Sequence, residues 1–123
     1  MEFFLDKQLL RYEKVAQNAP VLKSSKKYLD QFFQLAPMYH ESMKVPEVSG
    51  ALRAQTVMYW VWGWDSMTSG ESMVYWGDLE FLGDMLYLME KHSHPEKGIP
   101  HGFTRSMELE WEAAPSAQGM YIT

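Results

Sequence analysis

Apolar residues recur at three- and four-residue spacing over three stretches of the chain, which is the repeat of an amphipathic α-helix. The stretches are residues 2–18, residues 24 or 25 to 35, and residues 79–91. Pro20 and Pro37 mark the expected ends of the first two, because proline interrupts helical hydrogen bonding. The short connection between these two helices predicts an antiparallel pair. In the second helix the expected buried side chains are Tyr28, Leu29, Phe32 and Phe33. The chain is therefore expected to have an all-α fold.

The remaining segments are expected to form one or two more helices and several loops. Residues 38–59 contain Pro46, Ser49 and Gly50 and are expected to be mostly extended or looped. Thr68-Ser69-Gly70-Glu71 matches a capping box, which predicts a helix over residues 68–76. Prolines and glycines punctuate residues 92–103, which predicts a loop. A last helix is expected to begin near Ser116.

Composition and charge limit the classes of function. The 123 residues are 46% hydrophobic, enough for one modest core, so we expect a single domain or part of one. The net charge of −5 provides no basic surface for a phosphate backbone, so nucleic acid is not an expected partner. No apolar stretch approaches the roughly 20 residues that cross a bilayer, so no membrane partner is expected. The absence of cysteine excludes thiol catalysis and disulfides among these residues.

Aromatic residues are most concentrated just before Asp65. Trp60, Trp62 and Trp64 alternate with Val61 and Gly63, so in an extended chain the three indole rings would share one face. Flat rings on one face suit a wall on which a sugar stacks, and they equally suit a buried core. The pattern alone favours the core.

Asp65 is the acidic residue with the most distinctive surroundings. It follows the aromatic run at the expected junction of an extended segment and a helix, where a carboxyl group could be partly desolvated. Desolvation favours the protonated form that a general acid requires. The plainer alternative is that Asp65 or Ser66 caps the helix that follows.

The other polar residues give weaker signals. Glu71 and Asp78 are explained as helix caps, and Glu80 and Asp84 are expected on a solvent-exposed helix face. If Glu71 shared a helix with Asp65, the two would lie about 120° apart and about 9 Å along the axis, which does not make a catalytic pair. His92, His94 and His101 lack the fixed helical spacing of zinc motifs, so no metal is expected. No phosphate-binding loop or nucleophile elbow is present, and no cofactor is expected.

Three runs of residues resemble segments of a known enzyme family, the third of them loosely. The run Tyr59-Trp60-Val61-Trp62-Gly63-Trp64-Asp65-Ser66-Met67 resembles the aromatic-Trp-Asp-Ser segment of trehalase-like glycoside hydrolases, including family 63 enzymes. The run Gly98-Ile99-Pro100-His101-Gly102 is similar to a loop that follows a later helix in those enzymes. The run Ala114-Pro115-Ser116-Ala117-Gln118 is loosely similar to the start of a further helix in the same family.

The resemblance implies a fold of helical hairpins, an (α/α)6 toroid of which this chain would supply only part. In such a fold Asp65 would project into a central pocket and act as the general acid of an inverting glycoside hydrolase. The substrate would be an α-linked glucoside or a related oligosaccharide. The implied substrate-binding residues are Trp60, Trp62, Trp64, Arg53 and His101.

The resemblance also implies that residues 1–123 are the first part of a longer catalytic domain, whose catalytic base lies further along. Inversion requires an acid and a base about 6.5–9.5 Å apart, so the isolated chain is expected to be inactive. Uncovered helix faces are expected to make it self-associate. Two alternatives stay open: a small all-helical binding or structural module without catalysis, and a carbohydrate-binding protein in which Asp65 accepts a hydrogen bond from a sugar hydroxyl.

Overall fold

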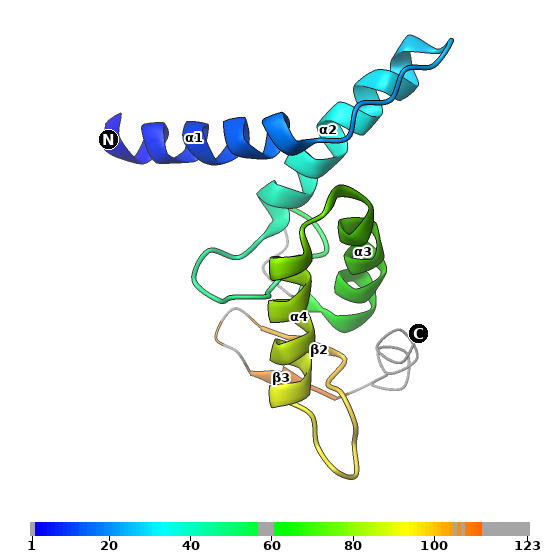
Figure 1. Cartoon of the computed structure of the whole chain (residues 1–123). Helices are drawn as coiled ribbons and strands as arrows, with labels where there is room; N and C mark the ends of the chain where they lie inside the picture. The colour runs from blue at the N-terminus through cyan, green and yellow to red at the C-terminus, as the bar shows by residue number, and fades with distance from the viewer. Residues whose placement is uncertain (1, 57–60, 105, 107, 112–123) are drawn as a thin grey trace. The chain divides into compact units, whose positions relative to one another are not determined.

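The computed structural model describes residues 2–56, 61–104, 106 and 108–111 of the chain. These residues form four helices and three short strands in the order α1, α2, β1, α3, α4, β2, β3 (Figure 1). The predicted helical class is confirmed in the sense that helices predominate, although a small sheet accompanies them. The chain divides into two compact units, Met1–Ser42 and Met43–Thr123, which are described in turn.

The first unit consists of α1 (Glu2–Asn18) and almost all of α2 (Lys27–Met43). The bounds of α1 agree with the apolar period. The prediction that Pro37 stops the second helix is wrong, because α2 continues through Pro37 to Met43. A proline inside a helix loses one backbone hydrogen bond, but the Pro37 side chain is buried, and this burial offsets part of the loss.

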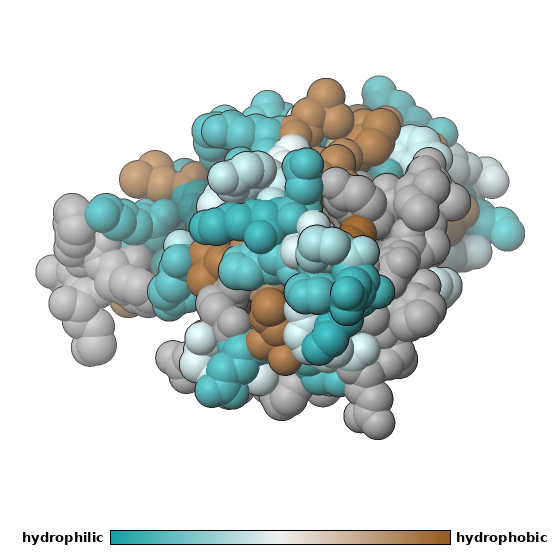
Figure 2. All heavy atoms as spheres, turned by 90° about the horizontal axis from the view of Figure 1, so that it is seen from below, coloured by the Kyte–Doolittle hydropathy of each residue, from teal (hydrophilic) through white to brown (hydrophobic). Residues whose placement is uncertain are grey.

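The apolar side chains of α2 are less covered than its sequence predicts. Tyr28 and Phe32 are each 63% exposed and Phe33 is 40% exposed, so the predicted buried stripe is wrong except for the half-buried Leu29. On the face drawn in Figure 2, hydrophobic residues likewise form separate groups between hydrophilic ones. No helix among the described residues is long and apolar enough to cross a bilayer.

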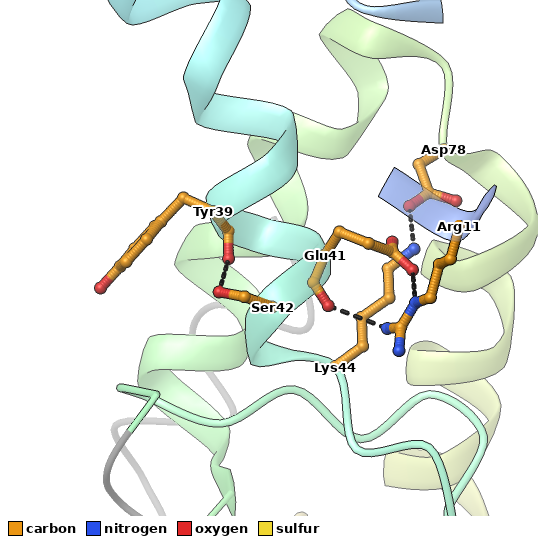
Figure 3. Close-up of polar contacts among 6 residues, drawn as sticks. All are labelled: Arg11, Tyr39, Glu41, Ser42, Lys44 and Asp78. Carbon is orange, nitrogen blue, oxygen red and sulfur yellow. Dashed lines mark hydrogen bonds and ion pairs between the residues drawn. The ribbon is translucent and has the colours of Figure 1, made fainter. Parts of the chain in front are cut away.

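The two helices of the first unit do not form the predicted antiparallel pair. Arg11 of α1 binds the last turn of α2, where Nε forms an ion pair with the Glu41 carboxylate and Nη2 donates to the Glu41 carbonyl at 2.9 Å (Figure 3). In Figure 1, α1 crosses α2 near this end instead of lying along it. Glu41 is only 7% exposed, so this ion pair is largely shielded from solvent.

The second unit is built around the helical hairpin of α3 (Gly63–Trp76) and α4 (Leu79–Lys91). Gly77 ends α3 with φ 78°, a left-handed conformation that favours glycine, and its N–H bonds to the Met73 carbonyl. Between the helices, Gly70 of α3 faces the Met85 side chain of α4. The fully or nearly buried core residues are Met43, Ala51, Leu52, Val61, Met67, Met73, Met85, Leu88, Met89, Ile99 and Phe103.

The start of α3 corrects the predicted capping box. The helix begins at Gly63, so Thr68 lies inside it, and the Thr68 hydroxyl donates to the Trp64 carbonyl at 2.9 Å. Asp78 does occupy the N-cap position of α4 but makes no side-chain cap bond. Its carboxylate instead lies 2.5 Å from Lys44 Nζ (Figure 3). The same Nζ lies 4.5 Å from the centroid of the Phe81 ring.

A small antiparallel sheet lies beside the hairpin in the second unit and was not predicted. Its strands are β1 (Val61–Trp62), β2 (Gly102–Phe103) and β3 (Leu109–Glu110), in the order β1-β2-β3. Each strand has two residues, which is too short for an alternating pattern to show in the sequence. The predicted loop over residues 92–103 therefore ends in a strand.

Candidate functional site

The sheet brings together the two described segments that carry the family resemblance. Trp62 in β1 pairs with Gly102 in β2, and Val61 pairs with Phe103. At the end of this ladder the Gly63 N–H donates to the His101 carbonyl at 2.6 Å. The rings of Trp62 and His101 lie 4.8 Å apart between centroids and are tilted by 45°. The Trp-Gly-Trp-Asp run and the Gly-Ile-Pro-His-Gly loop thus form one local structure.

Gly102 allows this close approach. A Cβ atom at residue 102 would lie 2.8 Å from the Val61 carbonyl oxygen and 2.9 Å from Cε3 of the Trp62 ring. Both distances are shorter than van der Waals contact, and the first involves a backbone atom that cannot rotate away. Glycine at residue 102 therefore lets β2 pack against the Trp62 ring.

Asp65 lies in the first turn of α3 and is exposed. The predicted partial desolvation is not seen, because the side chain faces away from the core of the second unit. The capping alternative is also wrong for both candidate residues. Trp62 is the N-cap residue and makes no side-chain cap bond, while the buried Ser66 hydroxyl donates to the Leu52 carbonyl at 2.8 Å. Asp65 is instead an acidic residue in the first turn of α3, where the helix dipole favours a negative charge.

The three tryptophans do not all belong to one extended segment. The strand ends at Trp62, which is half-buried, and Trp64 lies in α3 with 48% of its surface exposed. Strand alternation therefore does not place these two rings on one face. Trp60 lies outside the described residues.

Arg53 is connected to the start of α3 through its neighbour Leu52. The Ser66–Leu52 bond holds this loop against the first turn of α3, two residues of which are Trp64 and Asp65. The Arg53 guanidinium lies 3.4 Å from the carbonyl oxygens of Met43 and Thr56, both long hydrogen bonds. The loop is thus anchored near Asp65, while the guanidinium contacts one carbonyl at the end of α2 and one in its own loop.

Glu110 is a site residue that the sequence reasoning missed. Its Oε2 lies 2.6 Å from Nδ1 of His101, and its backbone carbonyl accepts from the His101 N–H at 2.8 Å. The side chains of both residues are 24% exposed. Glu110 belongs to no motif and lies in a strand of only two residues, so the sequence offers no signal that would have selected it.

The other carboxylates and histidines that the structure describes do not gather into a second candidate site. Glu71 is exposed and lies on the same helix as Asp65, α3. The two carboxylates are therefore about 120° apart around the axis and about 9 Å apart along it, as predicted for a shared helix. Asp78 binds Lys44, and Asp84 accepts a hydrogen bond from Ser49. Among the residues with described positions, no group of three histidine or carboxylate side chains could hold a metal ion.

No protein-family model, curated protein or solved structure matches this chain. The geometry around Trp62, Asp65 and His101 and the resemblance of the two described motifs are therefore what bears on its function.

Proposed function

We propose that this chain is part of an inverting glycoside hydrolase that acts on α-linked glucosides or related oligosaccharides, with Asp65 as the general acid. One observation carries the proposal. The two described segments that resemble trehalase-like enzymes are separated by the whole α3–α4 hairpin, yet they pair as β1 and β2. If each segment resembled the family only by chance, nothing would lead the two segments to pair with each other in the structure.

The position of Asp65 suits proton donation to a bound sugar. Its carboxyl group is exposed on the first turn of α3, two residues after Gly63, the residue bonded to His101. In the proposed reaction, protonated Asp65 donates its proton to the glycosidic oxygen as the bond to the anomeric carbon breaks. Water attacks that carbon from the opposite face and loses a proton to a second carboxylate. A bound sugar would cover the exposed carboxyl group and favour its protonated form.

The remaining predicted site residues are proposed to hold the sugar. Trp62 and Trp64, together with Trp60, would supply flat rings for the apolar faces of the sugar. His101 would donate or accept hydrogen bonds at the rim, and Arg53 would donate to hydroxyl groups after leaving its long bonds to backbone carbonyls. The ring contact between Trp62 and His101 supports this grouping.

The catalytic base is not assigned to any residue of this chain. Glu71 is unsuitable because it lies on the same helix as Asp65, about 120° around the axis. Inversion needs both carboxylates, so we propose that the 123-residue chain alone is inactive and that the base comes from elsewhere in the catalytic domain.

Hydrolysis by the full product of the reading frame tests the role of Asp65. The Asp65→Asn variant should lower kcat on an α-linked disaccharide by roughly 10²–10⁴-fold, the usual contribution of a general acid. The same variant should hydrolyse α-glucosyl fluoride much closer to the native rate, because fluoride leaves with little need for a proton. NMR of the first product should show the inverted β-anomer. The control is Glu71→Gln, which removes an exposed carboxylate from the same helix.

Three outcomes would contradict the proposal. A full product that hydrolyses no α-glucoside would favour a binding or structural module without catalysis. Equal losses on disaccharide and fluoride would show that Asp65 does not act as an acid. Retention of the α-anomer would exclude inversion.

A further inference from the structure

We infer that Glu110 is a positioning residue that orients His101 for a hydrogen bond to a sugar hydroxyl, an inference that rests on the proposed glycosidase function. Glu110 lies outside both motifs that carry the family resemblance. Its place in the site follows from the contact between Oε2 and Nδ1 of His101 at 2.6 Å.

The contact with Glu110 fixes which nitrogen of His101 carries the proton. A carboxylate can only accept a hydrogen bond, so Nδ1 must be the donor in this pair. The other ring nitrogen, Nε2, is then an acceptor in the neutral imidazole and a donor when the ring is protonated. Either form can bind a sugar hydroxyl, which is both donor and acceptor.

The ring plane of His101 is fixed by a second contact. The Trp62 ring lies 4.8 Å from the imidazole, measured between centroids. With Glu110 holding Nδ1 and Trp62 packed against the ring, His101 has little freedom to turn about its side-chain bonds. About a quarter of its side chain, 24%, stays exposed for a ligand.

The backbone of His101 is held by Glu110 and by Gly63, the residue that follows Trp62. Its N–H donates to the Glu110 carbonyl at 2.8 Å, and its own carbonyl accepts from Gly63 at 2.6 Å. Gly63 opens the helix turn that contains Asp65. Glu110 therefore sets the position of the His101 ring relative to the turn that carries the proposed acid, which is how a residue without substrate contact can influence binding.

The first measurement is the state of the imidazole. Long-range ¹⁵N NMR of the histidines in the 123-residue chain should show the Nδ1–H form for neutral His101, and Glu110→Gln should shift this ring towards a mixture of tautomers. The matched control is Glu108→Gln, which makes the same charge change at an exposed position two residues away. It should leave the His101 signals in place.

The second measurement is a double-mutant cycle in the full product with an α-linked disaccharide as substrate. Glu110→Gln should raise KM about tenfold with a smaller change in kcat, because a binding contact is loosened and the acid is untouched. His101→Ala should raise KM at least as much. Adding Glu110→Gln to His101→Ala should have no further effect, since Glu110 acts through His101.

The outcomes separate this inference from the proposed function. If the native product hydrolyses the disaccharide but Glu110→Gln and Glu108→Gln behave alike, the positioning role is overturned. The proposed glycosidase function is then unaffected. A shifted tautomer with an unchanged KM also overturns it, because Glu110 would then only support the fold. If the native product does not hydrolyse α-glucosides, the proposed function fails and this inference fails with it.

Discussion

Gly102 stands directly opposite Trp62, where any side chain would collide with the neighbouring strand. We expect Gly102→Ala to lower the free energy of unfolding by roughly 1–3 kcal/mol, the usual cost of forcing extra atoms into a packed site. The Trp62 ring should also be displaced from His101. Urea unfolding followed by tryptophan fluorescence measures the first effect, and loss of the ring-current shift on the His101 protons measures the second.

Gly83 provides the control for this substitution. It is exposed inside α4, and a Cβ atom there would meet nothing within 4 Å. Gly83→Ala should therefore stabilise the chain by about 0.5–1 kcal/mol, because alanine favours a helix over glycine. Similar effects of the two substitutions would show that the predicted crowding at Gly102 does not exist.

At the scale of elements, an ion pair between Arg11 and Glu41 joins α1 to α2. Glu41 is 7% exposed, so Arg11→Met would remove one positively charged partner from a nearly buried carboxylate. We expect this change to cost roughly 1–3 kcal/mol of stability, because hydrogen bonds to a charged group that is shielded from water contribute about this much. Loss of helical circular dichroism in urea measures it.

Two further variants test whether the effect belongs to the pair. Lys14→Met removes an exposed positive charge from the same helix and should change stability by less than about 0.5 kcal/mol. The double variant Arg11→Met with Glu41→Leu should recover part of the loss, because it removes the buried charge as well. A double variant less stable than Arg11→Met would contradict this account.

The elements that could be predicted from the sequence are the helices whose apolar period extends over many consecutive residues. The apolar periods of α1 and α4 run over many residues, and their predicted bounds agree with the structure. Short local motifs predicted the wrong helix start where tertiary contacts determine it. Thr68 and Glu71 suggested a helix start, but the bond from Ser66 to Leu52 stabilises the earlier start at Gly63.

The candidate site was predictable only in parts. Trp62 and His101 could each be selected from a local motif, but their contact depends on pairing between strands distant in the sequence. Glu110 could not be found in this way, because it belongs to no motif and reaches His101 through the β2–β3 pairing. Short strands leave almost no pattern in a sequence, so a site assembled by them is visible only in the structure.

At the scale of the whole molecule, both units leave large apolar side chains exposed. In the first unit Leu9 is 61% exposed and Leu10 is 65% exposed, both on α1. In the second unit Tyr75 of α3 is 84% exposed and Tyr87 of α4 is 64% exposed. Side chains of this kind gain free energy when another surface covers them, at about 25 cal/mol per Å² of apolar area.

We therefore expect the isolated 123-residue chain to self-associate through these helix faces. Sedimentation velocity should show an average mass that rises with protein concentration. Added salt should strengthen the association, because the net charge of −5 makes copies repel one another and salt screens that repulsion. Association through ion pairs would instead weaken as salt is added.

Substitutions on the exposed faces identify the surface involved. Leu9→Gln with Leu10→Gln should reduce self-association if α1 contributes, and Tyr75→Gln with Tyr87→Gln should reduce it if the α3–α4 hairpin contributes. Glu80→Gln, at an exposed polar position of α4, is the control and should leave the mass distribution nearly unchanged. A monomer at every concentration and salt level would show that the exposed apolar residues are too dispersed to form an interface.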